Sequence, residues 1–172
     1  VEVLVRQQPK KDGQYLRPSG SWVGWNLRGI WQDCSLRIEP AVRVADVWVK
    51  PSVRNKTLRV VATVENASTE SRTVSVAHHV DGVTIELKSE AALVAAGESV
   101  IVEAEASWAD PKLWSPEDPN LYWLETTLED AAAKSTVLDF RRTRFGFKEF
   151  WLEGLGFVLN GNPIRFKGDS WH

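Results

Sequence analysis

The chain has 172 residues, of which 43% are hydrophobic and 26% are charged, a composition that is ordinary for a globular protein. Its formal net charge is −2 and its lysines and arginines are dispersed, so the sequence does not favour binding to nucleic acid or to an anionic membrane. No apolar run approaches the ~20 residues that a membrane-spanning helix needs, and the N-terminus shows no signal-peptide pattern.

The first 40 residues contain short candidate strands at residues 1–5 and around residues 36–38, joined by a polar connection. Two or three strands cannot bury their own apolar face, so we expect this region to be part of a larger domain. Cys34 is the only cysteine, which excludes an internal disulfide bond and a cysteine-based zinc site. Because it alternates with polar neighbours along an apparent strand, Cys34 is predicted to be a small buried residue rather than a reactive thiol.

Residues 41–145 alternate between apolar and polar side chains with a period of two, in segments that polar turns separate. This pattern predicts an all-β fold, an antiparallel β-sandwich of about seven strands with the size of an immunoglobulin-like domain. Residues 49–107 contain no Phe, Tyr or Trp, so aliphatic side chains must fill most of the core. The candidate strands are residues 42–50, 57–66, 73–80, 83–87, 100–103, 122–128 and 136–140.

The same alternation predicts which side chains fill the core of the sandwich. A slip of one residue in register would exchange the two faces and place Val61 or Ile101 inside. Tyr122 stands at the start of a late strand, which is the position of a tyrosine corner in immunoglobulin-like folds. The predicted core residues are Val60, Val64, Val74, Val76, Val100, Val102, Leu124 and Leu128.

Two groups of residues have both a structural and a functional interpretation. His78 and His79 are adjacent on a predicted strand, so their side chains point to opposite faces, and no Asp, Glu or Cys at ligand spacing completes a metal site. The tryptophans flank the aliphatic sandwich in sequence, which favours packing between domains over stacking on sugar rings. They are Trp22, Trp25, Trp31, Trp48, Trp108, Trp114, Trp123, Trp151 and Trp171.

The last part of the chain contains a turn signal followed by a short apolar run. Asn160 and Gly161 lie between two apolar stretches, and such a pair accepts the positive φ angles of a tight hairpin turn. Residues 164–167 then look like the start of a new, buried strand that has no later partner in this chain. The chain also contains no methionine, and we expect it to be a segment of a longer protein.

Three landmarks occur in order along the chain. They are Gly-Ile-Trp-Gln-Asp at residues 29–33, Leu-Trp-Ser-Pro-Glu-Asp-Pro-Asn-Leu-Tyr at residues 113–122, and the runs at residues 144–149 and 157–168. Together they resemble glycoside hydrolase family 2, which includes β-galactosidases, β-glucuronidases and β-mannosidases. The resemblance implies three parts: residues 1–40 as the C-terminal remnant of a jelly-roll sugar-binding-like domain, residues 41–145 as the immunoglobulin-like β-sandwich, and residues 146–172 as the link and first strand of a (β/α)8 catalytic barrel.

The resemblance also implies that the parent protein is a retaining β-glycosidase, which hydrolyses O-glycosyl bonds with two glutamates, the acid/base one following an Asn. This chain has no Asn-Glu dipeptide, so we expect it to contain no catalytic residue and no cofactor, and to be inactive alone. Glu149 and Glu153 precede the implied barrel strand and are interpreted as solvent-facing or junction charges. The implied partners are the remaining domains of the same polypeptide and the carbohydrate substrate of the parent enzyme.

Asp169 and His172 follow the implied barrel strand, at the face of the barrel that carries the active site. A His at this place in relatives lines the sugar pocket, although Gly-Asp-Ser-Trp-His at residues 168–172 departs from the commoner Gly-Val-Asn-x-His. Both residues are therefore predicted substrate contacts of the intact enzyme only, and a disordered chain end is the alternative. For the whole chain, the alternative to a structural segment is a free-standing immunoglobulin-like carbohydrate-binding or adhesion module.

Overall fold

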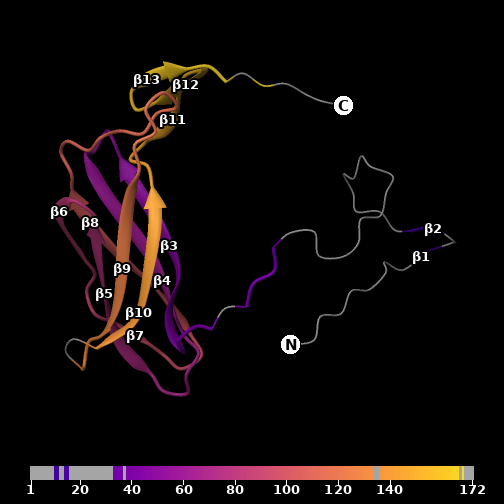
Figure 1. Ribbon diagram of the computed structural model, residues 1–172, viewed down its shortest axis with the longest axis vertical. Helices are drawn as coiled ribbons and strands as arrows, with labels where there is room; N and C mark the ends of the chain where they lie inside the picture. The colour runs from indigo at the N-terminus through magenta and orange to yellow at the C-terminus, as the bar shows by residue number, and fades with distance from the viewer. Residues whose placement is uncertain are drawn as a thin grey trace. The chain divides into compact units, whose positions relative to one another are not determined.

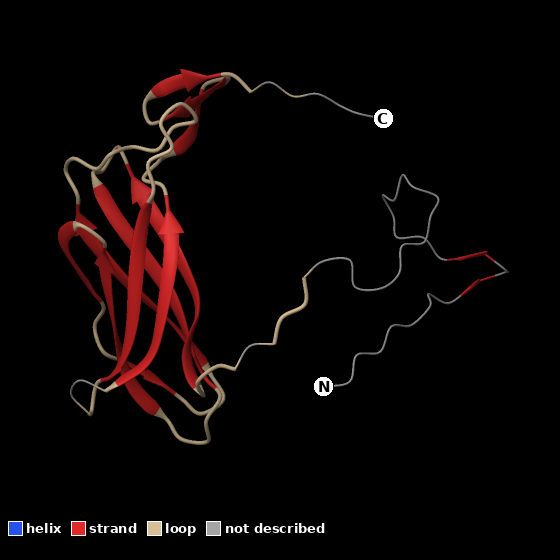
Figure 2. Ribbon diagram, in the orientation of Figure 1, coloured by secondary structure: helices blue, strands red, loops and turns tan. Residues whose placement is uncertain are grey.

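The computed structural model describes residues 10–11, 14–15, 33–36, 38–133, 136–166 and 168. The chain divides into two units, Val1–Ile38 and Glu39–His172. All regular elements of the described residues are strands, as the sequence predicted (Figure 2). Within these residues no helix combines the length and the apolar character needed to cross a bilayer.

In the first unit, β1 (Lys10–Lys11) pairs antiparallel with β2 (Gln14–Tyr15). The prediction that Cys34 is a buried strand residue is wrong, because Cys34 is exposed and belongs to no strand. Its described neighbours Asp33, Ser35 and Leu36 are exposed as well. Alternation buries a side chain only where a second layer packs against the strand, and the described residues provide none around Cys34.

The second unit contains a sandwich of two antiparallel sheets (Figure 1). One sheet has the order β3-β4-β8, and the other has the order β10-β9-β5-β6, with β7 also paired to β5. This arrangement confirms the predicted immunoglobulin-like sandwich. The strands are β3 (Val42–Ser52), β4 (Thr57–Asn66), β5 (Arg72–Val80), β6 (Val83–Lys88), β7 (Ala92–Val94), β8 (Ser99–Ser107), β9 (Tyr122–Asp130) and β10 (Val137–Phe145).

The core of the sandwich follows the predicted register. Ile101 is 64% exposed on the outer face of β8, so the face of that strand is assigned correctly. Val100 is only partly buried and packs at the margin of the core. The other predicted core residues are buried, namely Val60, Val64, Val74, Val76, Val102, Leu124 and Leu128.

Side chains of β10 hold β3 against the second sheet. The pairing of β3 with β4 shifts register between Val44 and Asp46, which leaves backbone groups of β3 in need of partners. The Asp139 carboxylate accepts a hydrogen bond from the Val44 amide at 2.8 Å, and Arg141 donates to the carbonyls of Val44 at 3.1 Å and Ala45 at 2.5 Å. Because unpaired backbone groups are costly once removed from water, these bonds connect the two sheets along this edge.

A buried histidine lies inside the sandwich between two groups of hydrophobic core residues. As predicted from their adjacency, His78 is buried on the inner face of β5 and His79 is exposed. His78 Nδ1 lies 2.9 Å from Thr126 Oγ1, whereas Nε2 has no hydrogen-bond partner among the described residues. Desolvation by burial lowers the pKa of His78 from 6.5 to about 4, so the ring is neutral at neutral pH.

The sandwich should therefore lose stability in mild acid. The unfolded chain binds a proton at His78 near pH 6.5 and the folded chain only near pH 4, so acidification favours unfolding across that interval. The full effect is a loss of roughly 3 kcal/mol in the free energy of unfolding. Urea titrations followed by tryptophan fluorescence should show a weaker dependence on pH for His78→Gln than for the control His79→Gln. Identical pH profiles of the two variants would contradict this assignment.

A small antiparallel sheet follows the sandwich, beyond the end of β10 (Figure 1). Asn160 and Gly161 have φ angles of 53° and 86°, which confirms the predicted tight turn between its last two strands. The small sheet consists of β11 (Phe150–Glu153), β12 (Gly156–Leu159) and β13 (Asn162–Ile164).

The prediction of a new strand beginning at Ile164 is wrong for the described residues. Ile164 is the last residue of β13 and pairs antiparallel with Phe157 of β12. Arg165 and Phe166 belong to no strand, and Phe166 is 65% exposed. The two-residue turn fixes the register of the hairpin, so β12 takes Ile164 as its partner. Lys167 lies outside the described residues.

Candidate functional site

The candidate site is the seam between the sandwich and the small sheet, where the loop joining β8 to β9 meets the segment that follows β10. Trp114 of that loop donates a backbone hydrogen bond to the Phe147 carbonyl at 2.9 Å. The Trp114 carbonyl accepts a second hydrogen bond from Asn160 Nδ2, also at 2.9 Å. Through its backbone, Trp114 is therefore bonded both to the segment leaving the sandwich and to the turn of the small sheet.

Asn160 makes three hydrogen bonds at this seam. Its Oδ1 accepts a hydrogen bond from the backbone amide of Glu149 at 2.9 Å. The backbone amide of Asn160 donates in turn to the Glu149 carbonyl at 2.9 Å. With the bond from Nδ2 to Trp114, the side chain joins three segments of the chain. The sequence signalled Asn160 only as a turn residue, because these partners are distant in sequence.

A close steric contact fixes how the chain leaves β10. A Cβ atom added at Gly146 would lie 2.8 Å from Cβ and Cγ of Trp114, which is closer than such atoms approach in proteins. Lys148 Nζ lies 3.8 Å from the centre of the Trp114 ring, a cation–π contact on the same side chain. Glycine at position 146 therefore allows the indole to pack directly on the backbone of the connecting segment.

An aromatic cluster forms the base of the seam inside the sandwich. The ring of Trp108 makes edge contacts with Tyr122 and Phe147, at centroid distances of 4.9 Å and 5.2 Å. Tyr122 also stacks on Phe145 at 5.7 Å, and its hydroxyl accepts a hydrogen bond from the Lys112 amide at 2.7 Å. This bond to an upstream backbone group agrees with the predicted tyrosine corner. Trp108 and Phe147 are buried at the base of the seam.

Glu149, directly before β11, makes several polar contacts with the sandwich. Its side chain is only 14% exposed. Arg54 approaches Glu149 Oε1 with Nη2 at 2.5 Å and Nε at 2.7 Å, and the Arg54 amide donates to Oε2 at 2.9 Å. Ser52 Oγ donates to Oε2 at 3.2 Å. Glu149 is thus a junction charge, one of the two roles that the sequence allowed.

The pKa of Glu149 reflects this environment. Burial alone would raise the pKa, but hydrogen bonds from Arg54 and Ser52 and the positive charge of Arg54 outweigh that effect and lower it below its ordinary value. A carboxylate with a lowered pKa stabilises the fold above its unfolded pKa, and this contribution is lost as the pH falls through the folded value. Arg54 also lies over the ring of Trp151, 4.7 Å from its centre, which orients the guanidinium.

Replacing Arg54 should loosen the small sheet while the sandwich stays folded. In Arg54→Gln, the backbone amides of β11 and β12 should exchange with deuterium faster, because loss of hydrogen bonds to a charged group lowers the local opening free energy by ~1–3 kcal/mol. Amides of β9 should be unaffected. Arg59→Gln is the matched control, since Arg59 pairs with Glu103 on the exposed surface of the sandwich. Equal exchange in the two variants would contradict the role of Arg54.

Adding a methyl group at position 146 should disturb the seam. Gly146→Ala places its Cβ against Trp114 and should cost ~1–3 kcal/mol in the free energy of unfolding, as overpacked sites do. The control is Gly156→Ala, where the added atom would make only an ordinary contact at 3.5 Å with the Glu153 carbonyl. Chemical unfolding of both variants measures the difference. A Gly146→Ala variant as stable as the wild type would show that Trp114 does not constrain this segment.

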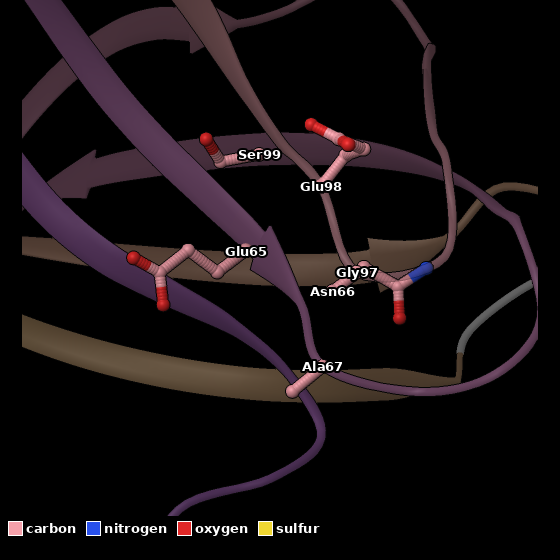
Figure 3. Close-up of a pocket in the computed structure, with 6 residues that line it drawn as sticks. All are labelled: Glu65, Asn66, Ala67, Gly97, Glu98 and Ser99. Carbon is pink, nitrogen blue, oxygen red and sulfur yellow. The ribbon is translucent and has the colours of Figure 1, made fainter.

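Two open hollows in the described residues carry no catalytic arrangement. One, of about 650 Å³, lies between the 112–120 loop and the Asn160 turn, and the amides of Asn120 and Asn160 that line it are bonded to backbone carbonyls. The other, of about 210 Å³, lies where β4 ends and β8 begins (Figure 3). There Glu65 is paired with Arg43, and the side chains of Glu65 and Glu98 project in different directions.

The residues predicted for substrate contact lie outside the described part of the chain. Asp169 and His172 are among them, and so are four of the tryptophans assigned to domain packing, namely Trp22, Trp25, Trp31 and Trp171. Trp114 and Trp151 lie at the seam, whereas Trp108 belongs to the core of the sandwich. Glu153 is exposed. No three His, Cys, Asp or Glu side chains of the described residues are placed to hold a metal ion.

The fold and the seam define an immunoglobulin-like sandwich that carries a small sheet fixed to one end. Residues 42–148 match the sequence profile of glycosyl hydrolases family 2. The match covers the whole sandwich and more than half of the chain, and the chain belongs to this family.

Individual relatives agree with the family assignment. A β-galactosidase of Halalkalibacterium halodurans is 31% identical over 169 residues, which are 92% of this chain and 16% of the relative. A calcium-binding mutant of Bacteroides uniformis β-glucuronidase 2 has a TM-score of 0.60 and 30% identity, covering 76% of this chain and 17% of that one. A β-galacturonidase of Eisenbergiella tayi shares the fold, with a TM-score of 0.62 and 23% identity over 74% of this chain and 22% of that one.

The chain spans about a sixth of the curated β-galactosidase that it matches along most of its length. It is therefore a fragment of a family 2 glycosidase-type protein, and the sandwich is the part that the family profile covers.

Proposed function

We propose that this chain is the non-catalytic structural segment of a family 2 glycosidase, in which the sandwich holds a sugar-binding-like domain at a fixed angle to the catalytic barrel. The observation that carries the proposal is the set of hydrogen bonds that Arg54, Ser52 and Trp114 make with Glu149 and Asn160. These directional bonds fix the small sheet to the end of the sandwich in one orientation. A segment that must transmit an angle between two domains requires such a rigid connection.

In this proposal, residues 1–40 are the remnant of the jelly-roll domain and residues 146–172 lead into the barrel. The parent enzyme is the full-length protein that contains this chain, and it hydrolyses O-glycosyl bonds with retention by means of two glutamates outside the chain. The names of the relatives, a β-galactosidase and β-glucuronidases, support a β-linked sugar as its substrate. Among the described residues, no buried carboxylate pair competes with this assignment, since Glu149 is held by Arg54.

The isolated chain should not hydrolyse aryl β-galactosides, β-glucuronides or β-mannosides above a heat-treated control. The parent enzyme should hydrolyse one of them, and NMR of the first sugar anomer released should show retention of configuration. Turnover by the isolated chain would contradict the assignment of catalysis to other domains. Specific oligosaccharide binding by the chain, together with an inactive parent, would favour the free-standing binding module instead.

Asp169 and His172 are proposed substrate contacts of the parent enzyme. If they line the sugar pocket, His172→Ala and Asp169→Ala in the parent should raise KM or lower kcat/KM, because the pocket loses polar partners for sugar hydroxyls. Glu153→Ala is the control, since Glu153 is exposed at the end of β11. Steady-state kinetics with the preferred aryl glycoside measures the effect. Unchanged kinetic constants in both variants would remove these residues from the site.

A further inference from the structure

One face of the small sheet is covered with exposed apolar side chains. The pairing of β11 with β12 and of β12 with β13 places Leu152, Phe157 and Ile164 in one row across the sheet. Leu152 is 66% exposed and Phe157 is 39% exposed. Phe150, two residues before Leu152, lies on the same face and stacks on Phe157 at 5.7 Å. We name this group, together with Phe166, the aromatic face.

The opposite face of the small sheet is partly covered by other residues of the chain. Trp151 and Val158 are cross-strand partners there. Val158 is buried, and Trp151 is partly buried beneath the guanidinium of Arg54 from the sandwich. A three-stranded sheet has only two faces, and the aromatic face is the one on which most large apolar side chains are exposed in the described residues. Leu159, the cross-strand partner of Phe150 on this face, is buried.

Phe166 shows where the chain goes after the sheet. It follows β13 and lies against Phe157 at 4.9 Å and against Phe150 at 5.8 Å, measured between ring centres. The ring of Phe166 therefore packs against the rings of the aromatic face. In the proposed parent enzyme, a domain that follows is tethered close in sequence to Phe166, and it competes for this face at a high effective concentration that a second molecule does not reach.

We infer that the aromatic face is the docking surface for the domain that follows this chain in the parent enzyme. The inference rests on the proposed function and adds the surface of this chain that the following domain would contact. Phe150, Leu152, Phe157, Ile164 and Phe166 carry no charge, so the partner must present an apolar surface free of unpaired charges. Clustered exposed aromatic side chains are typical of the buried centre of an interface and unusual on a free surface.

Hydroxyl-radical footprinting of the isolated chain and of the parent enzyme tests the inference. Oxidation of Phe150, Phe157 and Phe166 should be about fivefold or more slower in the parent, as expected when side chains enter the core of an interface. Leu93 and Ile101 are the controls, because they are 66% and 64% exposed on strands of the sandwich. Their oxidation should change less than that of the three phenylalanines. Equal oxidation of the phenylalanines in the isolated chain and in the parent would overturn the inference.

Two further results separate this inference from the proposed function. If the phenylalanines stay reactive in a parent that hydrolyses glycosides, the docking surface is wrong and the proposed function stands. If their oxidation in the isolated chain falls as the protein concentration rises, a second copy covers the face and the inference is also wrong. In the parent, Phe157→Asp should split a single thermal unfolding transition into two, whereas Ile101→Asp should not. A single transition in both variants would contradict coupling through this face.

Discussion

The carboxylate of Glu149 is the group on which the position of the small sheet depends. It accepts hydrogen bonds from the side chain and backbone of Arg54 and from Ser52, and its side chain is mostly removed from water. Rotation of the sheet would break these hydrogen bonds, and losing hydrogen bonds to a charged group costs free energy. Apolar contacts alone would tolerate sliding, whereas these bonds select one orientation.

Two other contacts support the same orientation by different physical means. Gly146 lets the Trp114 indole pack on the backbone, a steric constraint that acts where the chain leaves β10. Asn160 bonds to Glu149 and to Trp114, which fixes the hairpin turn relative to the loop. The aromatic rings of Trp108, Tyr122 and Phe147 pack against one another below these contacts. A sandwich with such contacts can hold two neighbouring domains at a fixed angle to each other.

The sandwich was predictable from sequence because burial of one face of a strand imposes alternation on neighbouring residues. Leu124 and Ile101 illustrate this, since one is buried and the other exposed as the pattern required. The Asn160 turn was predictable because it depends on two adjacent φ angles. The contact of Arg54 with Glu149 was not, because the two residues are 95 positions apart and neither lies in a local motif.

The two errors have the same origin. Cys34 was assigned from its alternation with polar neighbours and Ile164 from a short apolar run, and such local patterns do not show which strand, if any, will pair with them. In contrast, the opposite faces of His78 and His79 follow from strand geometry alone. That His78 Nε2 has no hydrogen-bond partner in the described part of the chain does not follow from it. Local rules thus predicted the strands and which face of each strand is buried. The contacts at the seam could be identified only from the three-dimensional structure.

A distance measurement across the seam tests the central claim that the small sheet is rigidly fixed to the sandwich. Spin labels would be attached at Glu105→Cys on β8 and Glu153→Cys on β11, both exposed, with Cys34 replaced by Ser. Pulsed electron paramagnetic resonance should give one narrow distance distribution in the isolated chain, and the same distribution in the parent enzyme. A broad distribution in the isolated chain, unchanged by Arg54→Gln, would contradict the claim.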